Sequence, residues 1–290
     1  MARYDAEHVG AAPWLLSGPA LLVFVALLLV PLLLTGVLSL NLFSDTEGVL
    51  PVYSLGNYLE VFKDGYFHEI FLRTGGMALA VTVLCVLLGV PETIIIARMA
   101  PRWRSLFLLV VLGPLLISVV VRTLGWAILL GNNGLINDAL QALGITEQPV
   151  KMLFTQVGVI IALTHVLVPF MVIAVWATLQ RLDLQVEWAG LSLGASRLTV
   201  FRRIILPQIM PGILSGSIIV FALAASAFAT PAIIGGRRLK VVATAAYDEF
   251  LGTLNWPLGA AIAMLLLVAN LIIIVGCSKL AERRFKQVFE

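Results

Sequence analysis

Six long runs of mostly apolar residues set the strongest limit on how this chain can fold. Polar segments separate the runs, and each run meets the roughly 20 residues that a helix needs to cross the hydrocarbon core of a bilayer. We therefore predict an all-α polytopic membrane protein with six transmembrane helices, at residues 14–40, 73–97, 105–130, 157–179, 212–234 and 258–276.

The composition agrees with a membrane chain. Of the 290 residues, 60% are hydrophobic and only 12% are charged, whereas a soluble domain carries about 25% charged residues. One transmembrane permease domain, residues 1–290, accounts for the whole length. The two cysteines, Cys85 and Cys277, lie in apolar runs, so we expect packing roles and no disulfide framework. The first run lacks a small-residue cleavage site, which favours an uncleaved first helix.

The basic residues indicate the orientation of the chain. If the amino terminus lies in the cytoplasm, the cytoplasmic segments hold about twice as many lysines and arginines as the outer loops, as the positive-inside rule expects. The carboxyl terminus and the polar segment 181–211 then also lie in the cytoplasm. The formal net charge of +3 follows from this topology and gives no reason to invoke nucleic acid as a partner.

The sequence lacks the residue patterns of an enzyme or of an ATP-binding chain. It has no G-x-x-x-x-G-K-[ST] loop and no G-x-S-x-G elbow. The three histidines lie in different regions without metal-ligand spacing, so we predict no metal site and no catalytic residue. Energy must come from another subunit or from an ion gradient. An ion-driven secondary transporter remains open, although it calls for paired acids in the spans and only Glu92 lies there.

The segment 181–211 is the longest polar interruption in the second half of the chain and predicts a hairpin of two short helices. Asp183 is placed to cap the first helix, and Gly194 is placed to end it. Ser196 is placed to cap a second helix, which runs into Pro207. The alternative is an amphipathic loop on the membrane surface.

This segment resembles the "EAA" loop of bacterial ABC importer permeases, on Gly194-Ala195-Ser196, Phe201 and Ile204-Ile205-Leu206-Pro207. The resemblance implies a cytoplasmic coupling helix that docks on a partner ATPase, which binds ATP and Mg. One position departs from the family, because its glutamate aligns with Trp188 and Glu187 stands one place earlier. A one-residue shift turns a helical side chain by roughly 100°, so we expect Trp188 to fill the ATPase groove. The predicted coupling residues are Glu187, Trp188, Ala189, Gly190, Gly194, Ala195, Ser196, Phe201 and Pro207.

Further blocks resemble the spermidine/putrescine branch of these importers, namely residues 133–137, 167–172, 230–236 and 256–259. The resemblance implies the type I ABC importer permease fold in a bacterial inner membrane, with this chain as the first of two permeases. It further implies two ATPase copies and a periplasmic solute-binding protein, with no cofactor in this chain. Many relatives carry an acid three residues before the Thr-Pro pair, where this chain has Ala227. The family resemblance implies a polyamine-like solute. The missing acid leaves an opine, an amino acid derivative or a phosphonate open as alternatives.

Ionisable residues at membrane depth are functional candidates by default. Arg122, in the third predicted span, is placed to gate the pathway, to bind an anionic solute group or to pair with a backbone carbonyl near a broken helix. We favour a structural or gating role, because polyamine-type permeases show a similar arginine. Glu92 is expected to reach the cytoplasmic interface and pair with Arg98, and His165 to bond a nearby backbone carbonyl.

The fifth predicted span combines small residues with backbone breaks at Pro231 and Gly235-Gly236. In transporters, irregular backbone at membrane depth is tolerated where it lines a cavity. The predicted pathway residues are Arg122, Trp126, Ser226, Phe228 and Thr230.

A basic cluster in an outer loop is an exception to the charge asymmetry. Three cations on that side suit an acidic face of a docking protein and equally well a solvated loop. The predicted binding-protein docking residues are Arg237, Arg238, Lys240, Asp248 and Glu249.

Overall fold

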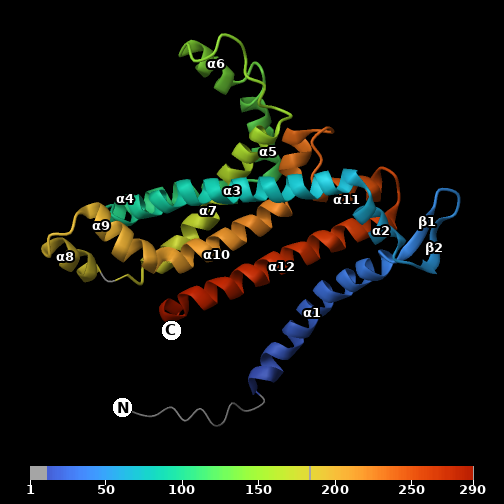
Figure 1. The fold of residues 1–290 in the computed structure, drawn as a ribbon, viewed down its shortest axis with the longest axis horizontal. Helices are drawn as coiled ribbons and strands as arrows, with labels where there is room; N and C mark the ends of the chain where they lie inside the picture. The colour runs from blue at the N-terminus through green and yellow to red at the C-terminus, as the bar shows by residue number, and fades with distance from the viewer. Residues whose placement is uncertain (1–11, 183, 290) are drawn as a thin grey trace. The chain divides into compact units, whose positions relative to one another are not determined.

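A computed structural model describes residues 12–182 and 184–289 of the chain (Figure 1). Helices dominate, and five of the described helices are long and apolar enough to cross a membrane, or six spans in total if one bent helix pair is counted as a span. The predicted fold class, a polytopic helical membrane protein, is confirmed. Predicted Asp183 lies outside the described residues.

Internal contacts group the chain into two compact units. The first combines Met1–Lys63 with Ala246–Met264, and the second combines Asp64–Ala245 with Leu265–Glu290. The single domain over residues 1–290 stays a prediction.

In the first unit, α1 (Ala12–Leu38) leads into a small antiparallel hairpin of β1 (Asn41–Ser44) and β2 (Gly48–Tyr53), followed by α2 (Gly56–Lys63). Asn57 of α2 is buried and donates its side-chain amide to the carbonyls of Ser39, at 2.9 Å, and Asn41, at 2.8 Å. This amide pins α2 to the base of the hairpin. The short helix was predicted, whereas the two strands lie in a segment that we predicted as a polar loop.

The core of the second unit is a set of three helices that lie side by side (Figure 1): α3 (Gly65–Ala97), α7 (Gln156–Leu179) and α10 (Leu206–Ala225). Met171 of α7 is fully buried between them. A Cβ atom at Gly89 of α3 or at Gly216 of α10 would lie 2.9 Å from a Met171 atom, so both glycines are needed for the close approach. Cys85 is buried in this core as expected, whereas Cys277 is exposed on its helix.

The third predicted span, 105–130, is not one straight helix. It consists of α4 (Pro101–Leu116) and α5 (Val119–Leu129), which meet at a bend of 98°. Pro114 stands in the last turn of α4, and Ile117 adopts an extended conformation with φ −93° and ψ 139°. Since a proline favours extended backbone before it and lacks an N–H, it weakens the last turn of the helix. The loop that follows contains α6 (Leu135–Ala142), as predicted.

The fifth predicted span, 212–234, is also corrected. A helical stretch runs without a break from Arg197 to Ala225, through α9 (Arg197–Val200), a π-helical turn η1 (Phe201–Ile205) and α10. It stops nine residues short of the predicted end, and a second π-helical turn, η2 (Pro231–Gly235), follows the break. Pro207 does not end the helix, because it occupies the first turn of α10, where its missing N–H costs little.

The remaining helices are α8 (Leu184–Ser192), α11 (Val242–Leu251) and α12 (Trp256–Phe289). The last of these continues well past the predicted end of the sixth span, so residues predicted as a basic tail are helical. The second and fourth spans contain the predicted ranges, although α3 begins eight residues early.

Candidate coupling surface and transport pathway

The segment 184–205 of the second unit is the predicted two-helix hairpin. Gly194 has a φ of +82°, a left-handed conformation that favours glycine. The N–H of Ala195 bonds to the carbonyl of Gly190 at 3.2 Å, and the N–H of Gly194 to that of Leu191 at 3.0 Å, which is the Schellman pattern of a helix end. Ser196 then accepts the N–H of Thr199 at 3.2 Å and caps α9. Both predicted signals are confirmed.

The hairpin closes tightly because Gly190 has no side chain. A Cβ atom there would lie 2.9 Å from the Ile204 side chain and 3.3 Å from that of Val200. Glycine at this position lets α8 pack directly on α9 and η1, and predicted Phe201 packs against the hydrophobic core of the second unit.

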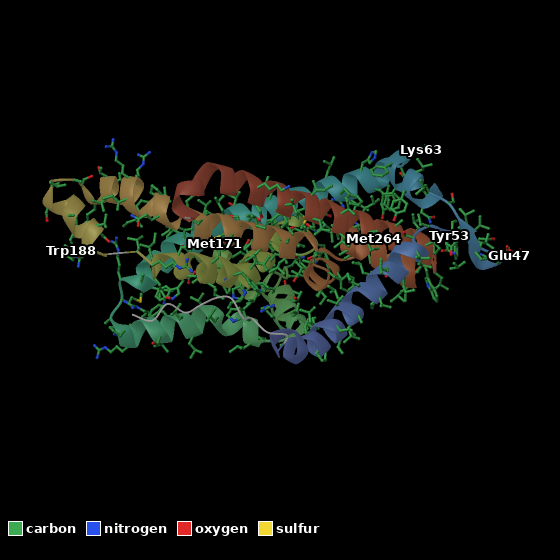
Figure 2. All side chains as sticks on the ribbon, turned by 90° about the horizontal axis from the view of Figure 1, so that it is seen from below. Glu47, Tyr53, Lys63, Met171, Trp188 and Met264 are labelled. Atoms are coloured by element: carbon green, nitrogen blue, oxygen red, sulfur yellow. The ribbon has the colours of Figure 1, made fainter. Side chains whose placement is uncertain are left out.

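Three large apolar side chains on the hairpin are exposed, although the segment is polar overall. Trp188 is 68% exposed, Leu193 is 89% exposed and Leu198 is 65% exposed. Figure 2 shows Trp188 at the end of the hairpin region, away from the helical core. An exposed apolar patch of this kind marks a protein or membrane contact site. Of the remaining predicted coupling residues, Ala189 and Pro207 are exposed, and Ala195 is half-buried.

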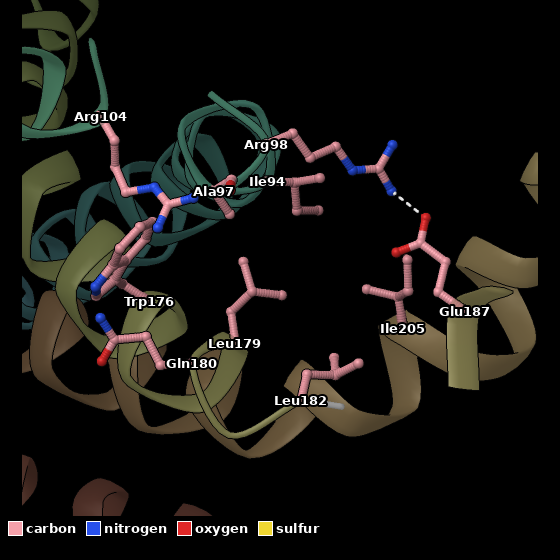
Figure 3. Close-up of a pocket in the computed structure, with 10 residues that line it drawn as sticks. All are labelled: Ile94, Ala97, Arg98, Arg104, Trp176, Leu179, Gln180, Leu182, Glu187 and Ile205. Carbon is pink, nitrogen blue, oxygen red and sulfur yellow. Dashed lines mark hydrogen bonds and ion pairs between the residues drawn. The ribbon is translucent and has the colours of Figure 1, made fainter. Parts of the chain in front are cut away.

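Glu187 does not point outward with Trp188. Its carboxylate accepts a hydrogen bond from the guanidinium of Arg98, at the end of α3, over 3.0 Å (Figure 3). This ion pair closes one side of a cavity of about 260 Å³, and Arg104 over the Trp176 ring closes the other. The predicted pair of Arg98 with Glu92 is wrong. Arg98 lies six positions after Glu92, and its guanidinium bonds Glu187 of α8 instead.

Arg122 lies at the bend between α4 and α5. Only 9% of its surface is exposed, and it donates from its guanidinium to the Pro114 carbonyl, at the end of α4. That carbonyl lies in the last turn of α4, where carbonyls lack the regular helical N–H donor, and it also accepts the N–H of Ile117 over 3.4 Å. Of the three roles considered, the observed contact is the pairing with a backbone carbonyl beside a broken helix.

The next turns of α5 connect the bend to the other helices. The hydroxyl groups of Thr123 and Thr230 lie 3.3 Å apart, both buried, so α5 touches the chain just before η2. Trp126 donates its indole N–H to Nδ1 of His165 over 3.2 Å, and the two rings meet edge to face. The expected backbone partner for His165 is therefore replaced by a side chain of another helix.

The predicted pathway residues around the end of α10 differ in exposure. Ser226 is exposed and bonds the carbonyl of Ala222 at 2.7 Å, Phe228 is 38% exposed, and Thr230 is 3% exposed. Thr230 thus serves the α5 contact, whereas the other two side chains reach the surface of the unit.

A groove of about 910 Å³ runs between α3, α4 and α7, with Trp126 of α5 at one end. Its wall is mostly apolar, and it contains Glu92 and His165. This groove was not predictable from the sequence, because helices that are distant in the chain form it.

The predicted docking residues divide between the two units. Arg237 and Arg238 of the second unit are exposed, and the carbonyl of Lys240 accepts a hydrogen bond from Arg73 over 3.1 Å. Arg73 also pairs with Glu69, so it joins this basic loop although we did not predict it. In the first unit, Glu249 accepts the Thr253 hydroxyl at 2.6 Å. Within the described ranges, no group of three metal-binding side chains occurs.

The structure is that of a polytopic helical membrane protein with a tightly closed hairpin that exposes several large apolar side chains. The model of the family described as "Binding-protein-dependent transport system inner membrane component" matches residues 12–286, and the chain belongs to this family. It is thus a non-catalytic, multi-pass inner membrane permease of an ABC importer, a class that works with an ATPase and a periplasmic binding protein. Membership in this family rules out the alternative of an ion-driven secondary transporter.

Named relatives and solved structures agree. The chain is 34% identical over 232 residues to the spermidine/putrescine transport system permease protein PotB of Escherichia coli (strain K12), covering 80% of this chain and 84% of that one. It is 34% identical over 201 residues to the molybdenum transport system permease protein ModB of Mycobacterium tuberculosis, covering 69% and 74%. A bacterial ABC transporter involved in alginate import has the same fold, with a TM-score of 0.73, 20% identity and coverage of 93% and 96%.

Proposed function

We propose that this chain is the first of two permeases in a type I importer that carries a solute of the spermidine/putrescine class. The hairpin 184–205 docks on one of two ATPase copies, with both termini in the cytoplasm. The observation that supports this most directly is the exposed tip formed by Trp188, Leu193 and Leu198 on a tightly closed hairpin. A rigid element with an apolar tip transmits movement in a way that a loose surface loop does not.

Trp188 takes the place of the family glutamate on the ATPase. Glu187 is held by Arg98 within the chain, and the next side chain along a helix points roughly 100° away. When ATP binding closes the two ATPase copies, α8 moves with them. The Arg98 contact passes this movement to α3, and the spans switch from inward-facing to outward-facing so that the docked binding protein delivers its solute. Arg237, Arg238 and Lys240, with Asp248 and Glu249, receive that protein on the outer side.

The solute class rests on the relatives. The PotB relatives span most of this chain, and their name states spermidine and putrescine transport. A second candidate is another solute of the same importer type, such as an opine, an amino acid derivative or a phosphonate. Ala227 in place of an acid, and a molybdenum permease among the relatives, favour this candidate.

Purification with partners tests the architecture. The chain, tagged at its carboxyl terminus and isolated in mild detergent, should bring along an ATPase and a second permease. Gly194→Asp places a charge at the hairpin break and should abolish ATPase association without loss of membrane insertion. Gly194→Asn is the matched control, because asparagine also tolerates the left-handed conformation and has a similar size without the charge. Normal association of the Asp variant would refute the docking role.

Reconstitution tests the solute. The purified importer in liposomes, with its binding protein outside and ATP inside, should accumulate radiolabelled spermidine. Accumulation of a phosphonate or an opine in place of spermidine would select the second candidate.

A further inference from the structure

We propose that the groove between α3, α4 and α7 is a binding site for an elongated organic amine, with the Glu92 carboxylate as its counter-ion. This inference rests on the proposed importer function and gives the site on this chain that recognises a cationic solute.

Among the residues whose side chains the structure describes, 17–182 and 185–279, none gives the Glu92 carboxylate a hydrogen bond or an ion pair. The cation expected for it, Arg98, is bound by Glu187. An ionisable side chain within a membrane span faces the bundle interior or a water-filled cavity rather than lipid. Glu92 lines an open, mostly apolar groove, and an acid in such surroundings calls for a cation.

The walls near the acid suit an organic cation rather than a metal ion. Apolar side chains of α3, α4 and α7 form most of the groove, including Phe107, and the indole of Trp126 on α5 adds an aromatic ring away from the acid. Aromatic faces attract ammonium groups and also cover methylene chains. A metal ion would need several oxygen ligands, and Glu92 is the one carboxylate among the described groove residues.

Helix register gives the length of the site. The thiol of Cys85 lies 3.7 Å from the Thr164 carbonyl, so the level of His165 on α7 matches the level of Cys85 on α3. Glu92 is seven residues further along α3, which corresponds to about 10 Å at the helical rise per residue. The acid and the aromatic end are therefore separated by the length of an extended amine with several methylene groups.

The aromatic end of the groove offers ring faces and no second carboxylate. Trp126 donates to Nδ1 of His165, which makes that nitrogen an acceptor and leaves Nε2 of a neutral ring as a donor. Arg122 is fixed one turn away at the Pro114 carbonyl, and Pro114 also lines the groove. This arrangement orients the ligand, with one ammonium group at Glu92 and the rest of its chain along the aromatic rings.

Direct binding tests the site without the transport cycle. The importer, purified with its ATPase and second permease but without the binding protein, is titrated with radiolabelled spermidine up to the millimolar range. Glu92→Gln keeps the shape and removes the charge, and we expect at least about tenfold weaker binding from the loss of a charged hydrogen bond. Glu92→Asp keeps the charge and should retain most of the binding. The control is Glu60→Gln, which removes an exposed carboxylate of α2 outside the spans and should bind spermidine as the unchanged importer does.

Three outcomes would overturn the site. Unchanged spermidine binding by Glu92→Gln would show that the Glu92 carboxylate does not bind the amine. Absence of binding to the unchanged importer removes the site itself. Loss of the second permease from purified Glu92→Gln, but not from Glu92→Asp, makes Glu92 the partner of a cation on that chain. The proposed function is judged separately, because ATP-dependent accumulation in liposomes with the binding protein reports on transport whatever the result at this groove.

Discussion

The coupling hairpin and the bent third span both contain a helix break, and different contacts stabilise the two breaks. In the hairpin, residues a few positions apart close the turn: Gly194 supplies the left-handed conformation and Ser196 caps the next helix. At the bend between α4 and α5, the exposed helix end is held by Arg122, from the other side of the break. Local signals make the hairpin rigid on its own, whereas the bend depends on one buried, charged side chain. Changes at the two places should therefore differ in what they disturb.

The largest effect is expected from filling the space that closes the hairpin. Gly190→Leu forces a side chain into Ile204 and Val200, which already leave only 2.9 Å and 3.3 Å for a Cβ atom. Overpacking of this kind costs about 1–3 kcal/mol and moves α8 away from α9. Association with the ATPase, measured by co-purification, should be lost while the chain still inserts.

Ser192→Leu is the control for that change, because Ser192 lies on the same helix and is exposed. If both variants associate normally, the closed hairpin is not what the ATPase recognises, and the contrast with the bend loses its functional meaning.

The same contrast explains which parts of the fold were predictable. Span lengths, the Gly194 break and the Ser196 cap follow from apolar runs and from residue types with one strong local preference. The end of α10 at Ala225 and the bend after Leu116 were not predicted, since proline tolerance and helix breaks depend on neighbouring helices. The hairpin of β1 and β2 was missed because its stabilising amide, Asn57, comes from a later helix.

The site was predictable to a similar extent. The predicted coupling residues share one short segment, so the sequence alone groups them on one hairpin, and their docking role stays a prediction. The partners of the charged groups were not accessible in this way. Arg98 and Glu187 are separated by 89 positions, and Trp126 and His165 by 39 positions, so only the packing of α3, α5, α7 and α8 brings them together.

Removal of Arg122 at the bend should impair the uptake of every solute equally. Arg122→Ala removes the charged donor from the Pro114 carbonyl and leaves it the N–H of Ile117, and loss of a hydrogen bond to a charged group costs about 1.5–3 kcal/mol. We expect uptake to fall about tenfold or more for each solute that the importer carries, with a lower thermal unfolding temperature. Arg102→Ala, at an exposed position of α4, is the control. Loss confined to anionic solutes would show instead that Arg122 reads substrate charge.

A smaller effect is expected at the contact between α5 and α7. Trp126→Phe keeps an aromatic ring but removes the indole donor to His165. A neutral hydrogen bond contributes about 1 kcal/mol, so uptake should fall about fivefold. Trp103→Phe, on an exposed ring of α4, should leave uptake unchanged. Equal losses in both variants would indicate that aromatic size, not this hydrogen bond, matters.

The smallest effect is expected from the ion pair that joins the hairpin to the end of α3. The Arg98 side chain is 55% exposed and that of Glu187 is 22% exposed, and exposed ion pairs contribute about 0–1 kcal/mol to stability. A double-mutant cycle with Arg98→Ala and Glu187→Ala should therefore give a thermal coupling energy below about 1 kcal/mol that falls as salt is added. Transport should respond more than stability does, because in the proposed mechanism this contact between α8 and the end of α3 passes the movement of the hairpin to the spans.

Arg197→Ala, an exposed cation of α9, controls for a general loss of charge. A large, salt-independent coupling energy would mean that the pair holds the fold together, and that movement of the hairpin reaches the spans by another route.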